Sequence, residues 1–193
     1  MKEITVGFAM CGSYCTFDSA IKALEEICRQ YKTVVPIMSE NAYSTNSRFG
    51  SAAGFREQVE RLCGGKKIIA SVAEAEPIGP KALLDILVVA PCTGNTLAKI
   101  AHGVTDTAVT MAAKAHLRNN RPLLIAISTN DALSTGAANL GSLLARKNVY
   151  FVPFYQDDPV NKPTSLIADL DKLPGAIEAA LEGRQTQPLL TFS

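Results

Sequence analysis

Residues 91–96 (PCTGNT) carry closely spaced hydroxyl and amide side chains, and this segment is the one best suited to bind a ligand. They follow residues 86–90 (ILVVA), a β-branched-rich apolar run without alternation, which predicts a strand buried on both faces of a parallel sheet. Pro91 is expected to end this strand, and the apolar pattern from Leu97 to Ala101 predicts a helix directly afterwards. Because free N–H groups at a helix start favour anions and polar ring edges, we predict a ligand site here.

Polar side chains also follow three other expected strands. These segments are Gly12 with Ser13 after residues 4–11, Ser39 at the end of 33–39, and residues 128–131 (STND) after 121–128. Gly12 has no Cβ, so a ligand can approach the backbone there, and Ser13 with the next helix start can bind a phosphate. A plain tight turn is an equally good interpretation of Gly12 and Ser13. Since parallel strands end at a common edge, the four segments should form one rim.

An extended polar loop is predicted at residues 40–54 (ENAYSTNSRFGSAAG), where regular hydrophobic patterning stops. Long loops after a strand's carboxyl end are often functional, although a mobile surface loop would have the same composition. Arg48 is its only cation, and a guanidinium group suits a carboxylate or phosphate. Arg48 is therefore the candidate anion-binding residue of this loop.

Apolar runs and helical periodicities alternate along the chain. Beyond the segments above, we expect helices at 17–31, 55–63, 97–102, 106–117, 136–146 and 174–182, and strands at 67–70 and 148–154. This alternation predicts an α/β fold, a Rossmann-like doubly wound parallel sheet with helices on both faces. We expect a single domain over residues 1–193, with a short C-terminal tail at about 184–193.

Composition excludes several classes of protein. The chain has 193 residues, of which 47% are hydrophobic and 19% charged, and its formal net charge is +1. These values do not fit a disordered chain or an electrostatic nucleic-acid binder. No apolar run reaches the roughly 18 residues that span a bilayer, and the start is a poor signal peptide, so we expect a cytoplasmic protein without a membrane segment. The five cysteines are an odd number without paired spacing, which indicates free thiols.

The rim lacks the residue patterns of most catalytic sites. No metal-ligand spacing, nucleophile–histidine arrangement, carboxylate pair or GxxxxGK[ST] loop is visible, and His102 and His116 lie on or beside expected helices and are interpreted as structural. A rim without strong acids or bases suits a protein whose chemistry comes from a bound cofactor. Because GxGxxG is absent, FMN is favoured over NAD. The alanine-rich helix at 106–117 is expected to pack closely against other backbone and to be partly buried in an oligomer.

Residues 91–96 resemble the Pro-Ala-Ser-Ala-Asn-Thr motif of the FMN-binding flavoprotein superfamily that includes the homo-oligomeric cysteine decarboxylases. Pro91, Asn95 and Thr96 match that motif, and Thr93 takes the place of its Ser. The resemblance implies trimers or dodecamers with FMN between neighbouring copies. It also implies which residues bind FMN, with Gly12, Ser13 and Ser39 near the phosphate and the 91–96 turn near the flavin ring. The full set of cofactor-binding residues is Gly12, Ser13, Ser39, Pro91, Thr93, Asn95, Thr96 and Ser128.

The decarboxylases of this superfamily also carry a Pro-x-Met-Asn-x-x-Met-Trp clamp and a catalytic histidine after the second strand. Residues 127–133 (ISTNDAL) keep the Asn, as Asn130, but have neither Met nor Trp. No histidine occurs between residues 1 and 101. Both departures disfavour thiol-linked decarboxylation.

Four further motifs extend the resemblance over the whole chain: residues 44–50 (STNSRFG), 75–81 (AEPIGPK), 111–115 (MAAKA) and 128–133 (STNDAL). Together they are similar to the flavoprotein subunits of two-subunit oxidoreductases that make pyridine-2,6-dicarboxylate in the mother cell of sporulating bacteria. The resemblance implies a nicotinamide-binding partner protein, through which NADP could take part, and a dihydro or hydroxy-tetrahydro precursor as substrate. Asn46, Arg48 and Asn130 are then the substrate-binding candidates, and Asn95 and Asn130 the catalytic ones. A decarboxylase and a non-catalytic partner protein remain as alternatives.

Overall fold

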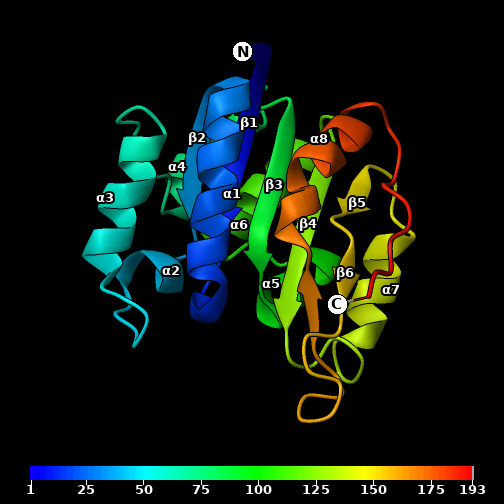
Figure 1. Cartoon of the computed structure of the whole chain (residues 1–193). Coiled ribbons are helices and arrows are strands. Elements are labelled where there is room, and N and C mark those ends of the chain that lie inside the picture. The colour runs from blue at the N-terminus through cyan, green and yellow to red at the C-terminus, as the bar shows by residue number, and fades with distance from the viewer. Residues whose placement is uncertain (193) are drawn as a thin grey trace.

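A seven-stranded sheet forms the centre of the fold in the computed structural model, which describes residues 1–192 (Figure 1). Its order is β2-β1-β3-β4-β7-β6, and β5 pairs with β4 beside β7. The pairs among β1 to β5 are parallel, whereas β7 is antiparallel to both β4 and β6. The strands are β1 (Lys2–Met10), β2 (Tyr31–Met38), β3 (Ile86–Cys92), β4 (Leu123–Thr129), β5 (Val149–Phe151), β6 (Phe154–Tyr155) and β7 (Leu166–Ala168).

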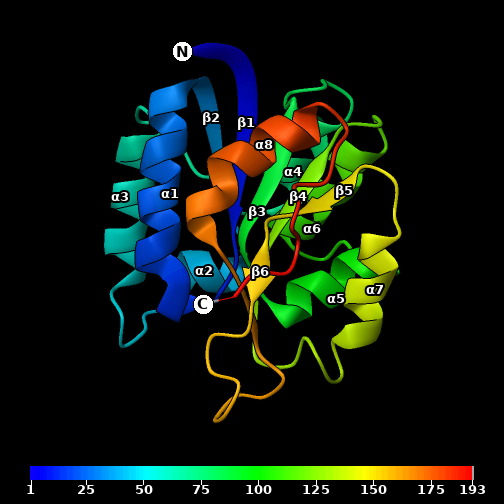
Figure 2. The same cartoon turned by 45° about the vertical axis from the view of Figure 1, so that its right-hand side comes forward.

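Helices cover both faces of the sheet. One apolar cluster packs α1, α3 and α8 against the sheet, and a second packs α4 to α7 against the opposite face (Figures 1 and 2). This arrangement confirms the predicted Rossmann-like α/β fold. The helices are α1 (Phe17–Gln30), α2 (Glu40–Ser44), α3 (Ala52–Leu62), α4 (Val72–Ala75), α5 (Gly94–His102), α6 (Ala108–Leu117), α7 (Ala137–Leu144) and α8 (Leu173–Leu181).

The central strand β3 is buried along its whole length, as its continuous apolar sequence predicts. Val88 belongs to the cluster under α1 and α8, while Val89 belongs to the cluster under α5 and α6. The prediction that Pro91 ends this strand is wrong, because β3 continues to Cys92. Pro91 has no N–H to donate, but its carbonyl still accepts from the Cys11 N–H at 3.2 Å, so contact with the neighbouring strand continues.

The predicted sheet lacked its antiparallel part. The expected strand at 148–154 divides into β5 and β6, and β7 was not predicted. Pro153 lies between the two strands, where its carbonyl accepts from the Asp169 N–H at 2.8 Å. At three residues, β7 is too short for alternation to reveal it. The sheet is therefore parallel through its centre and antiparallel at one edge.

Residues 40–54 contain more regular structure than the expected loop. Ser39 caps α2 by accepting from the Ala42 N–H at 3.3 Å, and Ser51 caps α3 by accepting from the Gly54 N–H at 3.1 Å. Residues 71–81 contain α4, which begins with a capping box between Ser71 and Glu74. The expected strand at 67–70 consists only of a bridge between Ile69 and Ile37.

The C-terminal segment lies along β5 and β6. The Gln185 side chain accepts from the Phe151 N–H at 2.8 Å and donates to the Phe151 carbonyl at 2.7 Å. Further on, the Phe154 N–H donates to the Leu189 carbonyl at 3.0 Å. The expected tail is thus hydrogen-bonded to the sheet up to Thr191, and its last residue lies outside the described residues.

Helix α6 packs closely against neighbouring backbone, as its alanine content predicts. Ala112, Ala113 and Ala115 are buried, and a Cβ added to Gly79 would lie 2.9 Å from the Ala115 carbonyl oxygen. His116 is 1% exposed, and its Nε2 lies 2.9 Å from the Pro122 carbonyl oxygen. Burial lowers the pKa of His116 to about 4. These contacts give His116 a structural role, and much of α6 is already covered within one chain.

We expect His116 to make stability depend on pH between about 6.5 and 4. In this window the unfolded chain binds a proton at His116 and the native chain does not, so the free energy of unfolding falls as pH falls. The loss is on the order of 3 kcal/mol. Urea denaturation at several pH values measures it. His116→Gln should flatten the curve, while His102→Gln, at an exposed position, should not; equal slopes for wild type and His116→Gln would contradict the assignment.

Candidate functional site

The carboxyl ends of β1, β3 and β4 meet at one edge and bring the predicted rim segments together. The Ser13 and Ser128 hydroxyl oxygens lie 2.8 Å apart, although 115 positions separate them in the sequence. Two cavities open at this edge. We call them the Ser13 cavity, of about 220 Å³, and the Asn95 cavity, of about 400 Å³. Gly12 and Thr93 line both, so the two cavities adjoin along the rim.

The amino end of α5 separates the two cavities. Thr93 caps this helix, its hydroxyl accepting from the Thr96 N–H at 3.3 Å and lying 3.2 Å from the Thr96 hydroxyl. Asn95 is exposed, and its amide forms no hydrogen bond with residues 1–192. The N–H groups of the first turn and the Asn95 amide are therefore available to a ligand in the Asn95 cavity.

The end of β4 packs directly over the first residue of α5. A Cβ on Gly94 would lie 2.6 Å from both the Thr129 hydroxyl and an Asp131 carboxylate oxygen, so a larger residue would have to displace the ends of these two side chains. Thr129 donates to Asp131 at 2.5 Å, and Thr135 donates to it at 2.9 Å. The bond from Thr129 is the main cause that lowers the pKa of Asp131. Asp131 consequently stays ionised and positions its neighbours instead of acting as a base.

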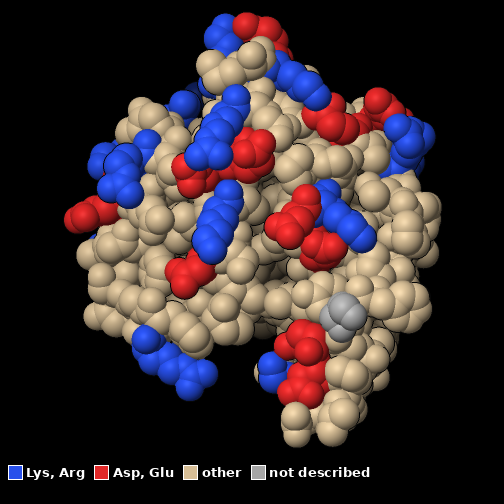
Figure 3. All heavy atoms as spheres, in the orientation of Figure 1, with Lys and Arg blue, Asp and Glu red and all other residues tan. Residues whose placement is uncertain are grey.

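The connection between β6 and β7 brings Lys162 to the rim. This connection projects beyond the carboxyl edge of the sheet (Figures 1 and 2), and the surface is hollowed beside the projection (Figure 3). Lys162 lines the Ser13 cavity and donates to Asp157 at 2.9 Å, while the buried Ser165 donates to the same carboxylate at 2.7 Å. The bond to Asp157 raises the pKa of Lys162. Sequence reasoning missed this cation because β7, which turns the chain back to the rim, was not predicted.

Each rim cavity contains one lysine paired with a carboxylate. In the Asn95 cavity, Lys99 donates to Asp106 at 2.9 Å, and this bond is the main cause that lowers the pKa of Asp106. The counterpart in the Ser13 cavity is Lys162 with Asp157. The remaining polar lining is mostly hydroxyl and amide, and neither histidine is part of it. The site can bind and orient an anionic ligand, and Cys15 and Glu40 are its other ionisable side chains.

Most of the predicted site residues lie at the rim. Ser13, Ser128 and Asn130 line the Ser13 cavity, Ser39, Asn95 and Thr96 line the Asn95 cavity, and Gly12 and Thr93 line both. Asn95 and Asn130, the catalytic candidates, thus face different cavities.

The other predicted site residues do not line either cavity. Pro91 is buried within β3. Asn46 accepts from the Ala52 N–H at 2.9 Å, and the Arg48 guanidinium lies 4.8 Å from the centre of the Phe49 ring. Within one chain, Asn46 and Arg48 therefore stabilise the segment before α3 and leave the rim to other residues.

The thiols behind the rim are unsuited to nucleophilic catalysis. Cys11 and Cys92 are fully buried, and burial raises the pKa of Cys11 to about 11. Burial also raises the pKa of Cys92 well above its usual range. Within residues 1–192, no group of three or more His, Cys, Asp or Glu residues could hold a metal ion, and no helix is long and apolar enough to cross a membrane.

The parallel sheet with this neutral, hydroxyl-rich rim is the architecture of a flavoprotein. The Flavoprotein family model matches residues 1–179, and the chain belongs to that family. The B subunit of dipicolinate synthase from Bacillus subtilis (strain 168) is 46% identical over 190 residues, which cover 98% of this chain and 94% of that protein.

Solved structures agree with this assignment. The crystal structure of the dipicolinate synthase B subunit from Bacillus halodurans has a TM-score of 0.90 and 41% sequence identity, covering 98% of this chain and 97% of that one. Burkholderia xenovorans DmrB in complex with FMN has a TM-score of 0.66 at 18% identity, covering 93% and 96% of the two chains. The second likeness shows a shared fold alone.

Proposed function

We propose that this chain is the flavoprotein B subunit of a dipicolinate synthase, an oxidoreductase in which it acts together with the A subunit. Its reaction would oxidise dihydrodipicolinate, or the hydroxy-tetrahydro precursor, to pyridine-2,6-dicarboxylate. The observation that carries the proposal is the 46% identity to such a protein over 98% of the chain. The rim supports it independently, because its neutral hydrogen-bonding groups suit a protein that positions a cofactor and an anionic substrate.

FMN is the cofactor that the rim fits best. The two adjoining cavities, of about 220 and 400 Å³, together fall within the usual size of a cofactor site. Gly12, Ser13 and Ser39 would lie toward the phosphate, and Asn95 and Thr96 toward the flavin ring. The unbonded Asn95 amide and the first N–H groups of α5 suit the polar edge of such a ring.

Conversion of a dihydropyridine into an aromatic ring needs an electron acceptor and little acid–base help, because the aromatic product supplies the driving force. Bound FMN would supply that acceptor for a hydride. The protein then has to hold the substrate ring in position and to neutralise its two carboxylates. Asn130 is the amide that lines the Ser13 cavity on the substrate side, and its own backbone is held by a 2.6 Å hydrogen bond from the Thr164 hydroxyl to the Asn130 carbonyl.

We propose Lys162 as the cation that binds a substrate carboxylate. Lys162 lines the Ser13 cavity beside Ser128 and Asn130, and its ammonium is held at the cavity by Asp157. Arg48, the cation proposed from the sequence, stacks on Phe49 instead.

The proposal includes the setting of the protein. The A subunit would be the nicotinamide-binding partner, through which NADP could take part in the reaction. The chain itself would form a trimer or dodecamer. The expected compartment is the cytoplasm of the mother cell in a sporulating bacterium. A decarboxylase is less well supported, because neither rim cavity contains a histidine and residues 127–133 lack the Met and Trp of the decarboxylase clamp.

The function is tested by reconstitution. The chain loaded with FMN and mixed with the A subunit should form pyridine-2,6-dicarboxylate from freshly generated dihydrodipicolinate, as measured by its ultraviolet absorption and by mass spectrometry. The FMN-free mixture and the A subunit without this chain should be much slower. Equal rates with and without this chain would contradict a catalytic role, and equal rates for the FMN-free and FMN-loaded chain would identify it as a partner that only stabilises the A subunit.

Replacement of Lys162 separates the two candidate cations. Lys162→Gln should raise the substrate KM about tenfold, because one charged hydrogen bond to a carboxylate is lost, and should change kcat much less. FMN affinity should change by less than about threefold. Arg48→Met is the matched control and should leave both constants near wild type. If Arg48→Met raises KM and Lys162→Gln does not, the substrate carboxylate is bound by Arg48.

A further inference from the structure

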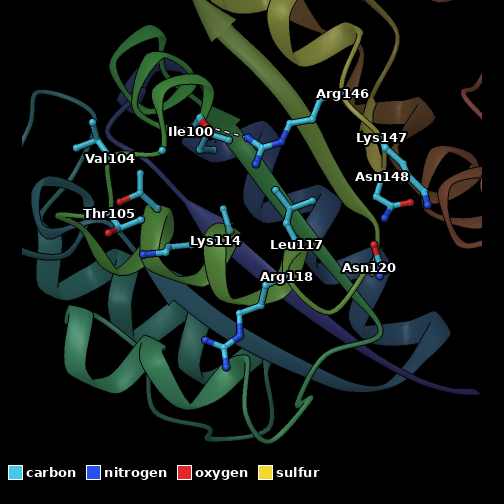
Figure 4. Close-up of a pocket in the computed structure, with 13 residues that line it drawn as sticks. Ile100, Val104, Thr105, Lys114, Leu117, Arg118, Asn120, Arg146, Lys147 and Asn148 are labelled. Carbon is cyan, nitrogen blue, oxygen red and sulfur yellow. Dashed lines mark hydrogen bonds between the residues drawn. The ribbon is translucent and has the colours of Figure 1, made fainter.

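A third cavity lies between the carboxyl ends of α5, α6 and α7, at the opposite end of α5 from the rim (Figure 4). Its volume is about 270 Å³, and it shares no lining residue with either rim cavity. Ile100 and Gly103 of the α5 end form one side, and Asn120 and Asn148, which precede β4 and β5, form another. The cavity is therefore a separate feature of the fold that the proposed flavin site does not use.

Four cations surround this cavity. Lys114 and Arg118 belong to α6 and its end, whereas Arg146 and Lys147 follow α7 (Figure 4). No carboxylate lines the cavity, and none of the four cations forms an ion pair in the described part of the chain. Because the whole chain has a formal net charge of only +1, this cavity is a strongly positive place on a nearly neutral protein.

Lys114 and Arg118 lie at the carboxyl end of α6, where cations are favoured, but only one of the four cations donates a hydrogen bond to a helix end. Arg146 donates to the Ile100 carbonyl at 3.2 Å, which satisfies a free carbonyl at the end of α5 (Figure 4). Lys114, Arg118 and Lys147 donate no side-chain hydrogen bond to any residue from 1 to 192. No carboxylate of the described residues neutralises these charges, and a bound anion would do so.

The floor between the cations is apolar. Leu117 lies at the centre of the cavity, with Ile100 beside it and Val104, which is 43% exposed, at the edge (Figure 4). Thr105, Asn120 and Asn148 add hydrogen-bonding groups around this floor. An inorganic anion would leave the apolar floor uncovered, whereas a ligand with both phosphates and a flat ring would cover it.

We propose that this cavity binds a nucleoside diphosphate, with its phosphates among Lys114, Arg146 and Lys147 and its base on Leu117. Guanidinium and ammonium groups together suit a diphosphate, because the first binds two oxygens at once and the second acts as a mobile point charge. The ligand would lie at the far end of α5 from Asn95, so both sites can be occupied in one chain.

Calorimetric titration of the full-length chain with ADP, inorganic pyrophosphate and adenosine tests the proposal. ADP should bind, pyrophosphate should bind more weakly because it leaves the apolar floor uncovered, and adenosine should not bind measurably. The double variant Lys114→Gln/Lys147→Gln should weaken ADP binding at least tenfold and should reduce its dependence on salt, because two charges leave the cavity. Neither side chain forms a hydrogen bond within residues 1–192, so the melting temperature should stay near wild type.

The matched control is Lys22→Gln/Lys81→Gln, which removes the same charge from two exposed positions elsewhere. It should leave ADP affinity within about twofold of wild type. No binding of ADP to the wild-type chain would overturn the proposal. Equal weakening in both double variants, or no weakening in either, would also overturn it, because the anion would then be bound by net charge or at the rim.

Discussion

The contact between the end of β4 and the first residue of α5 fixes the geometry of the rim. Thr129 and Asp131 lie so close to Gly94 that any side chain there would displace them. Thr93 then caps α5 immediately beyond β3, and Ser128 is held 2.8 Å from Ser13 across the same edge. The close packing of the α5 amino end against the end of β4 thus involves Gly94, Thr129 and the following Asp131.

This constraint explains why the superfamily motif differs here. Residues 91–96 keep Pro91, Asn95 and Thr96, while Gly94 takes the place of an alanine. The change accompanies Asp131, whose ionised carboxylate is held by Thr129 and Thr135 above the helix. A carboxylate with a lowered pKa is a poor base, and the rim has no histidine. Both facts agree with a function in which the bound cofactor, and not a side chain, carries the chemistry.

Much of the rim could be predicted because its residues follow long apolar strands. The parallel arrangement of the strands brings Gly12, Thr93 and Ser128 together whatever the details of the connections. The expected strand ends were therefore sufficient to predict these rim residues. Lys162 could not be found in this way, since its position depends on the three-residue strand β7. Arg48 was selected for its chemistry within a polar loop, but capping by Ser39, Asn46 and Ser51 folds most of that loop into helix ends.

The cations around Leu117 could not be predicted from the sequence. They come from two helix ends separated by about 30 residues, and neither segment has a charge run that would single it out. Only the packing of α5, α6 and α7 reveals that these side chains surround one cavity. Sequence patterns therefore located the rim, which lies at strand ends, and missed the cavity around Leu117, which lies between helix ends.

The central claim is that the rim binds a flavin mononucleotide through the amino end of α5. Titration of the FMN-free chain with FMN, followed by the flavin absorption band, tests it most directly. We predict a saturable change that Asn95→Ala weakens about five- to tenfold, through the loss of one or two hydrogen bonds, and that Asn139→Ala on α7 leaves unchanged. A flavin band that does not shift, or equal affinity for wild type and Asn95→Ala, would contradict the account.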